Sequence, residues 1–159
     1  MLFRSDLAMK LGMDVPLFLR DSSALATGRG EILNFSDIDI PYFILVVYPG
    51  IHISTPEAYK SLNRSADGKN PTNLLKYISE YNNKIEKLRN IIFNDFEEYV
   101  FNAYPEIANI KDKLYQNGAR FALLTGSGSA VYGFFSSEEQ CRAAEKKFQN
   151  YQTFLCKFV

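Results

Sequence analysis

Apolar residues follow a helical spacing through much of the second half of the chain. They recur three or four residues apart in three stretches, which predicts helices over residues 71–81, 84–104 and 105–117. Another helix is predicted to run from Ser137, whose hydroxyl can cap its first turn, to about Asn150. This half therefore has a clear succession of helices between its strands.

Uninterrupted apolar runs indicate the strands. Residues 42–48 are apolar throughout, as expected of a central strand that is covered on both faces. Two shorter runs, 120–124 and 130–135, are joined by the small residues Thr-Gly-Ser-Gly-Ser, and residues 153–159 form a last strand. Small residues suit a tight hairpin turn, and they also let the backbone approach a ligand closely. The pattern alone leaves both interpretations of this loop open.

The first forty residues have a weaker pattern. They predict a helix from Ser5 or Asp6 to Leu11 and extended segments over 15–19, 23–26 and 31–35. A helix of two turns is a poor start for a domain, and these segments have no obvious sheet to join. We therefore place a domain boundary near Pro41, which divides the chain into residues 1–40 and 41–159.

Composition restricts the class of protein. The chain has 159 residues of which 47% are hydrophobic, enough for a globular core, and its eighteen basic residues balance eighteen acidic ones. This balance does not indicate nucleic acid or an anionic membrane as a partner. The two cysteines have no metal-ligand spacing, and the longest apolar run is too short to cross a bilayer. A soluble cytoplasmic protein without a bound metal is expected.

The order of the elements predicts the fold class. A strand, several helices, a hairpin, a helix and a last strand are typical of an α+β fold. We expect a ferredoxin-like domain, with helices on one face of an antiparallel sheet. Many unrelated functions occur on such folds, so the function depends on particular residues.

Five short motifs carry a family resemblance. In chain order they are Leu-Gly-Met-Asp-Val-Pro-Leu-Phe at 11–18, Gly-Arg-Gly-Glu at 28–31, Tyr-Pro-Gly at 48–50 with Ser-Thr-Pro-Glu-Ala-Tyr at 54–59, Asn-Asp-Phe-Glu at 94–97 and Gly-Ser-Gly-Ser at 126–129. Each motif is common by itself, but their fixed order is specific. The chain resembles the C-terminal half of the 4-diphosphocytidyl-2-C-methyl-D-erythritol kinases, a family of the GHMP kinase superfamily.

The resemblance implies a catalytic role for Asp14. In the family, the aspartate of this motif takes or orients the proton of the substrate hydroxyl as that oxygen attacks the γ-phosphate of ATP. A carboxylate suits this step, because a hydroxyl becomes a nucleophile only as it loses its proton. Without the resemblance, Asp14 reads as a turn residue two positions before Pro16. Met13 stands where the family usually has a smaller residue.

The resemblance also implies a substrate-binding segment, made of Thr55, Pro56 and Tyr59. Tyr59 would stack on the cytosine ring and Thr55 would supply a hydroxyl. The alternative is a short helix that Thr55 caps, with Pro56 in its first turn and a partly buried tyrosine. The glycine-rich loop would lie beside the phosphate-binding loop of the N-terminal half, and its residues are Gly126, Ser127 and Gly128. His52 is interpreted as structural. So are Asn94, Asp95 and Glu97, for which a solvated helical face is the alternative.

The phosphate-binding loop of the superfamily does not occur in these residues, and so the resemblance implies a fragment. Residues 1–40 would be the end of the N-terminal catalytic domain, and residues 41–159 the GHMP kinase C-terminal domain. ATP and Mg²⁺ would be cofactors of the full-length enzyme, an ATP-dependent small-molecule kinase of the non-mevalonate isoprenoid pathway. Its substrate would be cytidine diphosphate-linked methylerythritol.

The fragment itself is expected to be inactive and to self-associate through apolar side chains near residues 15–19. Two alternatives remain at this level. One is another GHMP kinase, of the homoserine or mevalonate type. The other is a non-catalytic ferredoxin-like module that binds a ligand or a partner.

Overall fold

The computed structural model of the chain describes residues 2–12, 15–27, 32–36, 39–62 and 74–158. They form two compact units, which meet in the chain between Asp39 and Ile40, next to Pro41. The assignment of these units to the two domains of a GHMP kinase stays a prediction. Among the described residues, no helix has the length and apolar character needed to cross a membrane.

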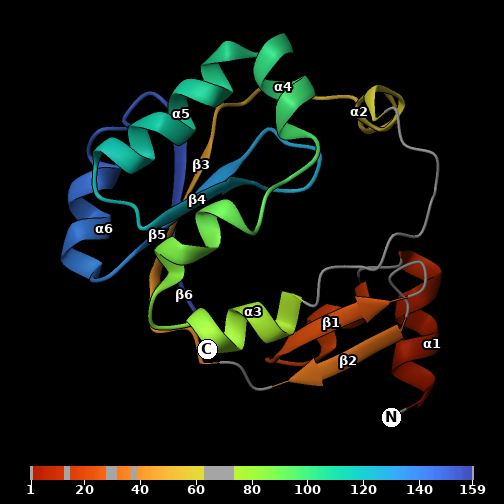
Figure 1. Cartoon of the computed structure of the whole chain (residues 1–159). Helices are drawn as coiled ribbons and strands as arrows, with labels where there is room; N and C mark the ends of the chain where they lie inside the picture. The colour runs from red at the N-terminus through yellow and green to blue at the C-terminus, as the bar shows by residue number, and fades with distance from the viewer. Residues whose placement is uncertain (1, 13–14, 28–31, 37–38, 63–73, 159) are drawn as a thin grey trace. The chain divides into compact units, whose positions relative to one another are not determined.

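The first unit contains a helix, a short 3₁₀-helix and a β-hairpin. In chain order these elements are α1 (Leu2–Leu11), η1 (Val15–Leu19), β1 (Ser23–Thr27) and β2 (Ile32–Ser36). The helix begins earlier than predicted, and the predicted extended segment at 15–19 is wrong. Pro16 explains this, because its fixed φ suits the first turn of a helix. The two strands pair with each other in antiparallel register, Ala24 opposite Phe35 (Figure 1).

The second unit is built on an antiparallel sheet. Its strands are β3 (Phe43–Tyr48), β4 (Phe121–Leu124), β5 (Val131–Phe135) and β6 (Gln152–Lys157), in the order β4-β5-β3-β6. The long apolar run is a central strand as predicted, because β3 pairs with β5 on one side and with β6 on the other. Leu45 and Val47 of β3 are fully buried.

Two of the helices in this unit pack on one face of the sheet. The helical elements are α2 (Thr55–Ser61), α3 (Leu74–Tyr81), η2 (Ile85–Asn90), α4 (Glu97–Ala103), α5 (Pro105–Gln116) and α6 (Glu138–Glu145). Figure 1 shows α5 and α6 lying along the strands, with which both are in contact. Their buried side chains, such as Leu114 of α5 and Cys141 of α6, join Leu45 and Phe135 of the sheet in one core. The α+β fold with an antiparallel sheet is confirmed.

The opposite face of the sheet carries aromatic side chains. Successive residues of a strand point to opposite faces, so Tyr132 and Phe134 face away from α5. Their rings lie 5.5 Å apart between centroids. Burial raises the pKa of Tyr132 from 10.0 to about 12, with a smaller contribution from the Glu97 carboxylate. The backbone N–H of Ile85 donates to the hydroxyl of Tyr42, which brings η2 to this aromatic cluster.

The single helix predicted over residues 84–104 is wrong. Instead η2 ends at Asn90 and α4 begins at Glu97. Between them, the Asn94 side-chain oxygen accepts a hydrogen bond from the backbone N–H of Phe96, at 2.9 Å. Asparagine side chains compete with the backbone in this way and interrupt helices. Helix α6 also ends before the predicted Asn150, whereas its cap by Ser137 is confirmed.

Candidate functional site

The loop between β4 and β5 is a tight hairpin connection. The backbone N–H of Thr125 donates to the carbonyl of Ala130, and that of Gly128 donates to the carbonyl of Thr125. Gly126 and Gly128 have φ angles of +54° and +96°, where a side chain is disfavoured. A Cβ on Gly128 would lie 2.8 Å from Cδ1 of Ile53. The hairpin interpretation is confirmed, and the place of this loop beside a ligand stays a prediction.

The loop contacts the segment predicted to bind substrate. The hydroxyls of Thr55 and Ser127 lie 3.1 Å apart and share a hydrogen bond, although 72 residues separate them in the chain. The prediction that Thr55 caps α2 is wrong, since Ser54 occupies the N-cap position and makes no side-chain cap. Pro56 lies in the first turn of α2, as predicted. The fold therefore joins two of the sequence-predicted segments.

Tyr59 projects from the surface of α2. It is 62% exposed, and it contacts Phe96 edge-on with ring centroids 5.1 Å apart. The alternative of a partly buried tyrosine therefore does not hold. A ring with this exposure, steadied by a neighbouring aromatic, has the properties that stacking on a base requires.

Asn94 fixes the start of the glycine-rich loop. Its amide nitrogen donates to the carbonyls of Leu124 and Gly126, at 2.9 and 2.7 Å. Sequence reasoning treated this residue as structural and missed the contact with the loop. The only local signal was an asparagine inside an otherwise helical pattern.

Glu97 supports the same loop from the next turn. Its carboxylate accepts a hydrogen bond from the backbone N–H of Leu124 at 3.0 Å and pairs with the Lys111 ammonium at 2.8 and 2.7 Å. Both side chains of this ion pair are largely buried. A structural role for Glu97 therefore fits this geometry, and the alternative of a solvated helical face does not hold. The ammonium neutralises a carboxylate that would be costly to bury alone.

Ser129, the last residue of the Gly-Ser-Gly-Ser motif, connects this loop to the segment that precedes α2. Ser129 is buried, and its hydroxyl donates to the carbonyl of Ile51, the residue before His52. His52 itself is exposed. In the described part of the chain no group of histidine, cysteine or acidic side chains is arranged to hold a metal ion. Asp14 lies outside the described residues, and its catalytic role stays a prediction.

Comparisons with known proteins agree with these observations. A family model described as "GHMP kinases C terminal" matches residues 74–152. The 4-diphosphocytidyl-2-C-methyl-D-erythritol kinase of Azobacteroides pseudotrichonymphae is 42% identical over 129 residues, which cover 80% of this chain and 46% of that protein. The kinase of the same name from Pelodictyon phaeoclathratiforme is 42% identical over 143 residues, 88% of this chain and 49% of that protein.

A solved structure shows the same arrangement. The crystal structure of a 4-(cytidine 5'-diphospho)-2C-methyl-D-erythritol kinase matches with a TM-score of 0.79 and 27% identity, covering 95% of this chain and 55% of that one. The chain spans about half the length of the curated relatives it matches. The chain therefore contains the C-terminal domain of the GHMP kinases.

Proposed function

We propose that this chain is the C-terminal half of an ATP-dependent kinase that phosphorylates 4-diphosphocytidyl-2-C-methyl-D-erythritol. The observation that carries the proposal is the 42% identity to two kinases of this name over most of the chain. The contact between α2 and the glycine-rich loop supports it, because it brings together two segments expected at such a site.

In this proposal Asp14 acts on the substrate hydroxyl. It takes or orients the proton of that hydroxyl, so that the oxygen can attack the γ-phosphate of ATP. Because the chain spans about half the length of its relatives, we assign ATP and Mg²⁺ to the complete enzyme. Bound there, Mg²⁺ would neutralise charge on the phosphates.

Tyr59 and Thr55 would recognise the cytidine end of the substrate. The exposed ring of Tyr59 offers a face on which the base can stack. The Thr55 hydroxyl is already bonded to Ser127, so it would act by orienting the loop as much as by direct contact. Asn94 and the Glu97–Lys111 ion pair would hold the loop in place while the substrate is converted to product.

Kinetics of two variants of the full-length enzyme test the proposal. Asp14→Asn keeps the size of the side chain but removes the proton acceptor, so turnover should fall by ~100-fold or more with ATP affinity little changed. Tyr59→Ala should raise the KM for the cytidine substrate, because base stacking contributes ~1–3 kcal/mol. Phe154→Ala is the matched control, since Phe154 is also an exposed aromatic but lies on β6.

Either of two results would contradict these roles. Near-normal turnover of Asp14→Asn would make Asp14 a turn residue. If Tyr59→Ala weakened ATP binding and left binding of the cytidine substrate unchanged, α2 would contact ATP and the assignment of Tyr59 to the cytidine end would be wrong. Unchanged kinetics of Phe154→Ala would show that loss of an exposed ring does not by itself disturb the enzyme.

We further propose that the 159 residues alone have no kinase activity. The chain spans about half the length of its relatives, and transition-state charge on the γ-phosphoryl group must be neutralised by groups positioned around it. ADP formation from ATP and 4-diphosphocytidyl-2-C-methyl-D-erythritol, measured at high protein concentration, checks this. Substrate-dependent ADP formation that persists after repurification and is lost in Asp14→Asn would refute it.

A further inference from the structure

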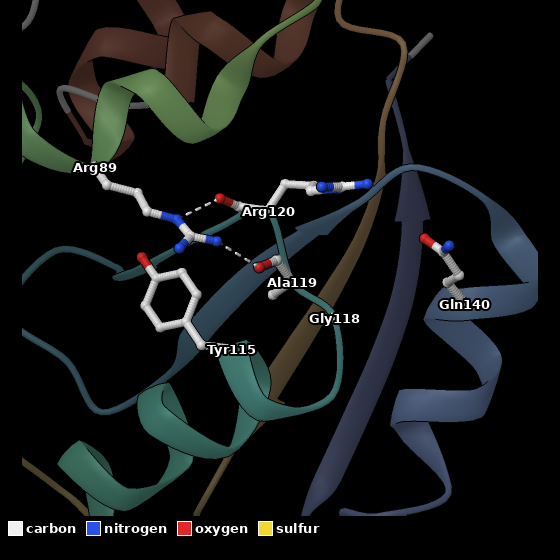
Figure 2. Close-up of a pocket in the computed structure, with 6 residues that line it drawn as sticks. All are labelled: Arg89, Tyr115, Gly118, Ala119, Arg120 and Gln140. Atoms are coloured by element: carbon white, nitrogen blue, oxygen red, sulfur yellow. Dashed lines mark hydrogen bonds between the residues drawn. The ribbon is translucent and has the colours of Figure 1, made fainter.

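A pocket of about 430 Å³ opens at the beginning of β4. It is lined by Arg89, Tyr115, Gly118, Ala119, Arg120 and Gln140 (Figure 2). The glycine-rich loop follows the other end of the same strand, so the pocket and the loop lie at opposite ends of β4. At about 3.3 Å per residue, roughly 20 Å of extended chain separates Arg120 from Gly126.

The guanidinium of Arg89 is held in place on one side of the pocket. Its Nε donates to the carbonyl of Arg120 at 2.7 Å, and its Nη2 donates to the carbonyl of Ala119 at 2.9 Å. The guanidinium carbon lies 4.4 Å from the centroid of the Tyr115 ring. The Tyr115 hydroxyl in turn bonds the backbone of Ala122, which fixes the ring. A guanidinium has five N–H donors, and these contacts leave some of those of Arg89 available to a ligand.

Arg120 supplies a second guanidinium. Its Nε donates to the Ser136 hydroxyl at 3.2 Å, and Figure 2 shows the group extending toward α6, where Gln140 lies. Within the described ranges, neither Arg89 nor Arg120 has a carboxylate at ion-pair distance. By contrast Arg142, two residues after Gln140 on α6, is paired with Glu138 at 2.7 Å.

Two guanidiniums at one pocket, with no carboxylate partner among the described residues, favour an anion. Planar guanidiniums bind phosphate and carboxylate oxygens with paired, charge-assisted hydrogen bonds. Because backbone carbonyls, a ring and a hydroxyl already restrain them, little side-chain freedom would be lost on binding. The volume exceeds what one phosphate needs and suits a small organic or condensed phosphate.

We propose that this pocket binds a small oxyanion with at least two negative charges, through Arg89 and Arg120, with the Gln140 amide as an additional donor. Phosphate esters, condensed phosphates and polycarboxylates share this chemistry. The proposal is independent of the kinase reaction, since it uses none of the residues assigned to that site.

Calorimetric titration of the chain with inorganic pyrophosphate, and separately with citrate, tests the proposal at low ionic strength. We expect saturable binding at millimolar concentrations or below, which Arg120→Gln weakens by ~10-fold or more through the loss of a charged hydrogen bond. Arg142→Gln is the control, because it removes the same charge from a nearby exposed position and should change the affinity less than about twofold.

The pattern of results decides between outcomes. Binding of pyrophosphate alone would support a phosphate ligand, and binding of both anions would support a general oxyanion site. Absence of saturable binding of either anion would overturn the proposal. Equal weakening by Arg120→Gln and Arg142→Gln would also overturn it, because the effect would then be one of net charge. Circular dichroism of each variant confirms that the fold is retained.

Discussion

Gly128 is the position in the glycine-rich loop where a side chain should cost most. Its φ of +96° lies outside the left-handed helical region that other residues occasionally adopt, which should cost Gly128→Ala about 1–2 kcal/mol. The new Cβ would also lie 2.8 Å from Cδ1 of the buried Ile53, and such overpacking costs about 1–3 kcal/mol. We therefore expect Gly128→Ala to lower the free energy of unfolding by roughly 2–5 kcal/mol.

Gly126 provides the matched control. Its φ is also positive, at +54°, but a Cβ there would meet nothing within 4 Å. Gly126→Ala should therefore cost only the conformational part, about 1–2 kcal/mol. Urea unfolding followed by circular dichroism and by tyrosine fluorescence measures both, since the chain has ten tyrosines and no tryptophan.

A variant of Ile53 separates the cost of the contact between the new Cβ and Ile53 from the cost of the backbone conformation. Ile53→Val removes the Cδ1 atom that the new Cβ would meet, and by itself it should cost about 0.5–1.5 kcal/mol. In the Gly128→Ala background the same change should cost less or even stabilise, giving a coupling of ~1 kcal/mol or more. If Gly128→Ala costs no more than Gly126→Ala, and the effect of Ile53→Val is additive, the packing argument is refuted.

Three other properties follow from single residues. Asn94→Ala should destabilise the chain by about 1–3 kcal/mol, because its two hydrogen bonds to the loop are lost. Asn94→Asp also lacks both N–H donors and should be destabilised as well. Full stability of either variant in urea would contradict this. The folded chain keeps the Tyr132 proton up to about pH 12, whereas the unfolded chain loses it near pH 10. The stabilisation is therefore complete below pH 10 and is lost between these two pH values, a loss of roughly 3 kcal/mol. Tyr132→Phe should show a smaller loss in urea midpoint from pH 9 to pH 11; an equal loss would refute the assignment. Burial raises the pKa of Cys141 to about 11, so iodoacetamide at pH 8 should modify the exposed Cys156 first, and equal rates by mass spectrometry would contradict the buried position.

Local pattern determined the elements whose stability depends on their own residues. The apolar run at 42–48 predicted β3, the three- and four-residue spacing after Pro105 predicted α5, and the small residues between two apolar runs predicted the β4–β5 hairpin. The ordered motifs indicated the superfamily, which the comparisons confirm. In each case the signal lies within one element or in the order of motifs along the chain, which requires no knowledge of distant contacts.

Tertiary structure alone decided where the chain departs from these patterns. The helix predicted over 84–104 is interrupted between Asn90 and Glu97, where the Asn94 amide bonds a loop thirty residues further along. The Thr55 hydroxyl bonds Ser127 and does not cap its own helix, and Glu97 is buried against Lys111 and does not face solvent. Hydrogen-bond partners distant in sequence leave no trace in local periodicity, since any polar residue fits the same pattern until the fold supplies its partner.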